Sequence, residues 1–209
     1  MKKPILIRVI SILILLVSLT MLTACSDDND NITEDTKDQT LSETNKDALL
    51  FMLEEEKLAR DTYTYIDNLW SINQFANIQK SEQTHMDAIE NLLIQNNIEY
   101  NIKPAGKFSN QTLQNFYNQF EIDATVSKAN AMQIGATIED LDIKDLQDYL
   151  DETTHLDLIA VFENLLCGSR NHLRSFVSGI EKGGNTYTPQ FITEENYNAI
   201  ISSSQEKCN

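Results

Sequence analysis

The sequence predicts an all-α protein built around a four-helix bundle. Glycine and proline are scarce, with 6 and 3 occurrences among 209 residues, so few positions interrupt a helix. Apolar residues recur at spacings of three and four along four long segments, which is the pattern of helices that bury one face. Alternating β-branched residues, the pattern of a half-buried strand, are absent from the sequence.

The first 25 residues are predicted to be a signal peptide and not part of the fold. A basic start with Lys2, Lys3 and Arg8 precedes an apolar run, residues 10–22, that is short for a membrane span. The run ends in Leu-Thr-Ala-Cys25, which resembles the lipobox of bacterial lipoproteins. That resemblance implies a lipid on Cys25 and a place in the bacterial cell envelope, at the outer membrane or cell surface. The alternative is a plain signal peptide with an incidental cysteine.

Residues 26–45 are predicted to be an acidic, disordered tether. They hold seven acidic residues, one lysine and two aliphatic side chains, Ile32 and Leu41, so they cannot bury enough apolar surface to fold. Without the signal peptide the formal charge falls from −16 to about −19. A surface this acidic argues against nucleic acid as a partner. We expect membrane attachment through the lipid, leave protein partners open and allow for a homodimer.

Residues 46–209 are predicted to form one helical domain. A cap at Thr44 or Asn45 starts the first helix, and the pair Gly183-Gly184 ends the fourth long one. In chain order the expected helices span about 46–70, 73–96, 110–120, from 127 onward, 154–183 and 193–203. The long connection, 97–126, joins the second and third long helices, and this layout is similar to that of ferritin-like bundles.

Carboxylate and imidazole side chains interrupt the apolar faces of all four long helices. Glu82 and His85 lie one turn apart on the second helix, at positions where its periodicity expects apolar residues. Glu56, Glu139 and His172 take inward positions on the other three helices. A buried carboxylate needs a partner, and Glu and His pointing inward from bundle helices are the ligands of carboxylate-bridged metal sites. We therefore predict a metal site formed by these five residues, with iron expected first and manganese or zinc as alternatives.

Two motifs resemble rubrerythrin-type proteins. Residues 56–63 read Glu-x-x-Ala-Arg-x-x-Tyr, like the first-helix motif of those proteins, and residues 81–85 resemble their second-helix motif. Over about residues 48–201 the chain resembles an uncharacterised ferritin-like family, a domain of unknown function, with further marks at 138–143 and 168–172. The resemblance implies a ferritin-like fold and a metal site, and no demonstrated activity.

The fourth helix departs from the di-iron pattern, which expects a second Glu-x-x-His. His172 is present, but position 169 holds a serine, so one carboxylate is missing. Asp142, one turn after Glu139, is a candidate replacement, as is water; alternatively, Asp142 caps a new helix starting at Ile143 and breaks the third. The residues expected beside the ligands are Arg60, Tyr63, Asp142 and Ser169.

Other polar residues have structural explanations. Glu152 and His155 also form a Glu-x-x-His pair, but at a predicted turn, where we expect both to be solvated. Cys167 is expected to be a small packed residue, and a disulfide to Cys208 is the less favoured alternative.

Two functions fit these observations, and whether the protein is an enzyme stays open. The first is a lipid-anchored ferritin-like domain that binds one or two metal ions and has an oxidase- or peroxidase-type redox role. The second is a non-enzymatic scaffold or interaction bundle, free of metal, whose inward polar groups pair with one another, for example Glu56 with Arg60.

Overall fold

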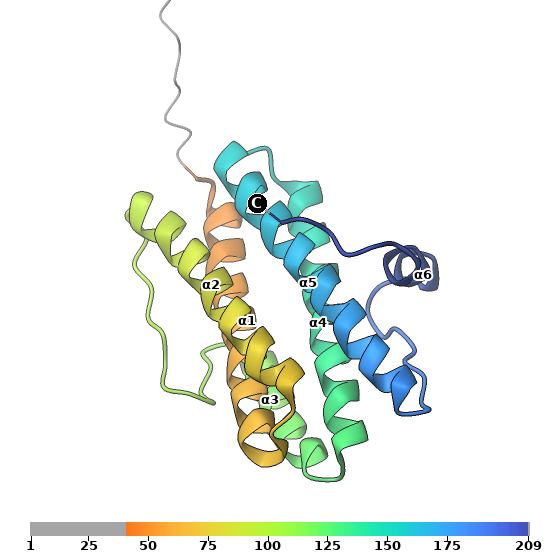
Figure 1. Cartoon of the computed structure of the whole chain (residues 1–209). Coiled ribbons are helices and arrows are strands. Elements are labelled where there is room, and N and C mark those ends of the chain that lie inside the picture. Colours follow the sequence, from red (N-terminus) through yellow and green to blue (C-terminus); the bar gives the residue numbers. More distant parts are fainter. Residues whose placement is uncertain (1–40, 209) are drawn as a thin grey trace, which may run out of the picture. The chain divides into compact units, whose positions relative to one another are not determined.

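The computed structural model describes residues 41–208, and these form six α-helices and no β-strand (Figure 1). In chain order the helices are α1 (Glu43–Trp70), α2 (Asn73–Gln95), α3 (Gln111–Ala124), α4 (Lys128–Glu152), α5 (Leu156–Lys182) and α6 (Glu194–Ser202). The all-α prediction is therefore confirmed for the described residues. None of these helices has the length and apolar character that crossing a bilayer requires.

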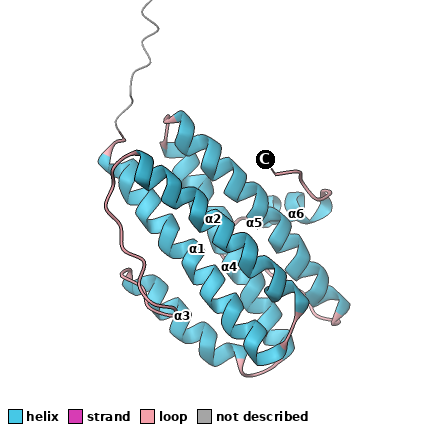
Figure 2. Cartoon of the chain, turned by 60° about the vertical axis from the view of Figure 1, so that its left-hand side comes forward, coloured by secondary structure: helices cyan, strands magenta, loops and turns pink. Residues whose placement is uncertain are grey.

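The four long helices, α1, α2, α4 and α5, form a bundle (Figures 1 and 2). The most extensive contacts join α1 with α2 and α4 with α5, and further contacts of α1 with α4 and of α2 with α5 close the ring. Near one end the rings of Tyr63, Phe75 and Phe176 meet, with centroids 5.0 to 5.5 Å apart. This aromatic cluster joins α1, α2 and α5 beside the polar groups at the centre.

Helix α1 begins at Glu43, three residues before the expected start. The Ser42 hydroxyl accepts a hydrogen bond from the Asn45 amide and caps the helix, and the side chain of Leu41 is buried. Residues 41–45, which their composition assigned to the tether, therefore belong to the folded domain. The predicted signal peptide, Cys25 and the rest of the tether lie outside the described residues.

Helix α4 is continuous through Asp142, so the predicted alternative of a break at this position is wrong. The Asp142 carboxylate does not cap a new helix because it accepts a hydrogen bond from the Ser169 hydroxyl on α5. A tertiary contact thus removes the local competition that favoured a break.

The long connection between α2 and α4 is held by a buried ion pair on α1. The Lys57 ammonium donates to Asp61 Oδ2 at 2.6 Å and to the carbonyl oxygens of Pro104 and Lys107 at 3.1 Å. Asp61 Oδ2 also accepts from the Gly106 amide at 2.9 Å, and Gly106 has the positive φ of 72° that glycine tolerates best. Lys57 and Asp61, charged residues of the first-helix motif, therefore hold this loop in place. Helix α3 follows the loop and packs on α1 and α4 (Figure 2).

Cys167 and Cys208 form a disulfide, so the prediction of a free, packed Cys167 is wrong. The segment after α6 runs back along α5, where Glu206 accepts hydrogen bonds from Arg170 at 2.8 Å and Arg174 at 2.7 Å. These ion pairs bring the two Cα atoms to 5.7 Å, within the usual disulfide range. The cross-link depends on this long-range contact, which local sequence patterns do not reveal.

Asp140 anchors the connection between α5 and α6, and its removal should destabilise the fold. Its buried carboxylate accepts hydrogen bonds from the Tyr187 hydroxyl at 2.7 Å and from the amides of Gln190 at 2.5 Å and Ile192 at 2.9 Å. We expect Asp140→Ala to lower the free energy of unfolding by about 3 kcal/mol, because buried donors lose a charged acceptor. Urea denaturation measures this change. The matched control, Asp148→Ala at an exposed ion pair with Lys144, should stay within about 0.5 kcal/mol of wild type.

Candidate metal centre

Each long helix contributes to one buried group of carboxylates and imidazoles at the centre of the bundle. All five side chains have exposed fractions of 12% or less. The group consists of Glu56 from α1, Glu82 and His85 from α2, Glu139 from α4 and His172 from α5. The structure therefore brings together the five residues that the sequence proposes as ligands, while their role as ligands stays a prediction.

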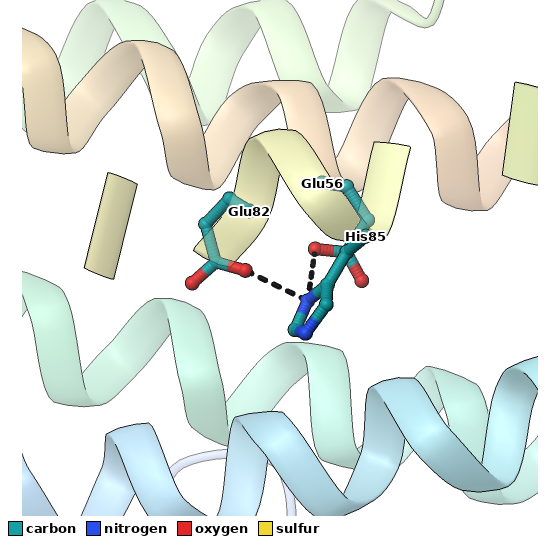
Figure 3. Close-up of side chains that lie close together, drawn as sticks. All are labelled: Glu56, Glu82 and His85. Carbon is teal, nitrogen blue, oxygen red and sulfur yellow. Dashed lines mark hydrogen bonds and ion pairs between the residues drawn. The ribbon is translucent and has the colours of Figure 1, made fainter. Parts of the chain in front are cut away.

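Glu56, Glu82 and His85 form the first of two overlapping clusters (Figure 3). His85 Nδ1 lies 3.1 Å from Glu56 Oε2 and 2.8 Å from Glu82 Oε2. The two carboxylates flank the imidazole from neighbouring helices. Oxygens and a ring nitrogen thus face one point, as the ligands of a single ion do.

Glu82, Glu139 and His172 form the second cluster. His172 Nδ1 lies 2.9 Å from Glu82 Oε1 and 3.4 Å from Glu139 Oε2. The Tyr63 hydroxyl donates to the other oxygen of Glu139 at 2.5 Å and so orients this carboxylate. Glu82 belongs to both clusters, because its two oxygens face two different histidines.

Close packing places the two imidazole rings side by side. Their centroids are 5.6 Å apart, and the rings are stacked. A Cβ atom at Gly168 would lie 2.6 Å from His85 Nε2, so the backbone of α5 approaches the ring as closely as a residue without a side chain permits. Within each cluster, one ligand atom from each residue lies within 4.8 Å of the others.

Burial and mutual charge shift the titration of these groups. Loss of hydration raises the pKa values of Glu56 and Glu139 from 4.5 to about 7, despite the neighbouring histidines. Burial also opposes the charged form of Glu82, but the two imidazoles outweigh it and hold its pKa well below the usual range. The pKa of His172 shifts in the other direction: Glu82 and Glu139 outweigh the effect of burial and raise it to about 10.

The buried centre has more carboxylates than cations to neutralise them. Even with His85 and His172 both protonated, three glutamates leave an excess of one negative charge, and buried Asp142 adds another acidic group. Such an excess is costly in a dry interior. The excess is therefore balanced by protons on the carboxyl groups or by metal ions, and both compete for the same oxygens.

The residues expected beside the ligands differ in their actual positions. Tyr63 contacts Glu139 directly, and Ser169 contacts Asp142. Arg60 instead donates to Asp61 and to Gln83, so the predicted alternative of a Glu56–Arg60 ion pair is not formed. The arginine of the first-helix motif therefore supports the helix pair and not the ligands.

The second Glu-x-x-His pair lies outside both clusters. Glu152 is exposed, as predicted, but His155 is buried at the start of α5, so the prediction of a solvated histidine is wrong. The chain turns between α4 and α5 at this point, and the backbone amide of His155 donates to the Thr153 hydroxyl at 3.2 Å.

Sequence reasoning misses Glu55, whose side chain is as buried as that of Glu56. Burial, followed by the charges of Asp142 and Asp145, raises its pKa well above the usual range. The sequence does contain a signal for the burial of Glu55, which lies three residues after Met52 and four before Ala59, both of which are buried.

The fold and site together define a helical-bundle domain with a buried centre of glutamates and histidines. Residues 45–204 match the family described as "Uncharacterized protein domain (DUF2202)", and the chain belongs to this family. It is 46% identical over 171 residues to the "Uncharacterized protein MJ0754" of Methanocaldococcus jannaschii, covering 81% of this chain and 92% of that protein. The crystal structure of hypothetical protein MJ0754 is similar with a TM-score of 0.79, covering 80% of this chain and 97% of that one.

The metal-free protein should lose stability as the pH rises from about 4.5 to about 7. Glu56 and Glu139 have pKa values raised from 4.5 to about 7 in the fold, so they keep protons there that the unfolded chain releases. Unfolding therefore releases protons in this window, and rising pH favours it. His172 acts in the same direction above pH 6.5, because its stabilising proton is lost as the pH approaches about 10.

Urea midpoints of the chelator-treated full-length protein at pH 5, 6 and 7.5 measure this dependence. A Glu56→Gln/Glu139→Gln variant should show a flatter profile, because it lacks the two groups that titrate in the window. A wild-type midpoint that rises between pH 5 and 7.5 would show that these carboxyl groups do not control the stability.

Proposed function

We propose that this domain is a ferritin-like metal protein that holds two ions at its centre. Glu56, Glu82 and His85 would hold one ion, and Glu82, Glu139 and His172 the other. The observation that carries the proposal is the position of Glu82, whose two oxygens face two different histidine–glutamate pairs. Glutamate and imidazole together suit iron first, with manganese and zinc as alternatives.

The proposed chemistry is the reduction of oxygen or peroxide, as in an oxidase or a peroxidase. A pair of iron ions would supply the electrons and the open coordination positions. The chain supplies a buried set of ligand side chains, a Tyr63 hydroxyl that orients Glu139, and carboxyl groups of Glu56 and Glu139 that hold protons near neutral pH in the metal-free protein. Binding of metal to Glu56 and Glu139 would release these protons, because a ligating carboxylate is deprotonated.

We further propose that the protein is exported and anchored in the cell envelope by a lipid on Cys25. The Cys167–Cys208 disulfide supports export, because such bonds persist in oxidising compartments and are rare in the cytosol. Cys25 itself lies outside the described residues, so the anchor is argued from the sequence.

A metal-free scaffold is the second candidate, and one observation favours it. His85 lies within 3.1 Å of two carboxylate oxygens, so the polar groups can pair with one another without an ion. Such a buried network can specify how helices pack without catalysis. Metal content separates the two candidates.

Full-length protein purified without chelating resins should contain about two ions per chain by mass spectrometry, or take up that number under anaerobic Fe(II) loading. Glu82→Gln should lose both ions because Glu82 lies in both clusters, whereas Glu56→Gln should lose one. The control is Asp87→Asn, an exposed acid on the same helix, which should keep both. Protein that stays folded yet metal-free after Fe(II) loading would leave the scaffold function.

The redox reaction is tested separately from metal binding. Wild-type protein loaded with Fe(II) should consume hydrogen peroxide faster than the Glu82→Gln variant at equal total iron. Equal rates would mean that the domain binds metal without the proposed redox role.

A further inference from the structure

The centre lacks one carboxylate on α5, at the place where Ser169 stands one turn before His172. Ser169 faces the same interior as the ligands, since its side chain is buried and the adjacent Gly168 lies against His85. A hydroxyl at this position is a weak substitute for a carboxylate, because it carries no charge to offset a divalent ion. Another group must therefore supply the missing charge if two ions are held.

Asp142 brings a carboxylate to Ser169 from the neighbouring helix α4. Its Oδ2 accepts a hydrogen bond from the Ser169 hydroxyl, so the two side chains meet between α4 and α5. Its Oδ1 is fully buried and has no hydrogen-bond partner among the described residues. A buried carboxylate oxygen without a donor is rare in folded proteins and indicates a partner that the chain itself does not provide.

The charges around Asp142 make a cation the partner that fits. Burial raises the pKa of the Asp142 carboxyl, and the charges of Glu56, Glu139 and Glu82 raise it further. Glu139 lies one turn before Asp142 on α4. Among the described residues no lysine or arginine is hydrogen-bonded to this carboxylate, whose hydrogen-bond partner is the neutral Ser169.

We propose that Asp142 is the fourth carboxylate ligand of the metal centre, held by Ser169 and replacing the glutamate that ferritin-like sites carry on the last helix. This assignment rests on the proposed function. Asp142 is not among the residues whose ligand atoms lie within 4.8 Å of one another, so its carboxylate would have to move toward the cluster to bind the ion. Ser169 is then a positioning residue, since it acts through Asp142.

The test compares metal binding by full-length wild type, Asp142→Asn and Asp142→Asn/Ser169→Glu. Asparagine keeps the shape but lacks the charge, so Asp142→Asn should bind Fe(II) or its probe Co(II) with one ion fewer per chain, or at least about tenfold more weakly. A glutamate at position 169 restores a carboxylate from α5 and should recover the lost ion. That recovery distinguishes a ligand from a residue that orients ligands, because the added glutamate does not restore an Asp142 contact.

Asp145→Asn is the matched control, one turn further along α4 and half-buried, and should keep wild-type metal content. Circular dichroism and urea denaturation of the metal-free forms establish that each variant is folded. Wild-type count and affinity in Asp142→Asn, with metal bound by the wild type, would overturn the assignment while leaving the proposed function intact. A wild type that takes up no metal would overturn the proposed function and the assignment together.

Discussion

The sharing of Glu82 between two histidines is the interaction on which the centre of this bundle depends. Its carboxylate stays charged because both imidazoles lie within 2.9 Å, and it links α2 to α5 through His172. Glu56 and Glu139 then extend the network to α1 and α4. All four helices therefore meet through polar groups at the centre of the bundle, and buried apolar and aromatic residues surround this centre.

The charged residues near the centre have two distinct uses. Lys57, Asp61 and Asp140 are buried, and each makes at least one hydrogen bond to loop backbone, so they hold the connections that flank the bundle. Glu56 and Asp142 each have a buried oxygen without a hydrogen-bond donor among the described residues. This contrast in hydrogen bonding, and not burial alone, separates the residues that hold the fold from those that are available to a ligand.

Spacing along the sequence predicted the helices and the five inward ligand candidates, because burial on one helical face is a local, periodic property. It could not predict features that depend on residues far apart in the chain. The Cys167–Cys208 bond follows from the return of the last segment along α5, and His155 is buried although its local sequence indicates an exposed turn. Asp142 shows the same limit, since its local sequence favours a helix cap and the contact with Ser169 decides otherwise.

The disulfide has a consequence for how fast the centre can open. Cys167 precedes Gly168, the residue whose backbone lies against His85, and its partner Cys208 belongs to a segment that Glu206 pins along the outside of α5. If this turn of α5 unfolds, the cross-linked segment must move with it. The disulfide therefore raises the free energy of local opening at this turn. An ion held there, as we propose, would exchange with the surroundings only through this opening, so its residence time would be set by the opening rate.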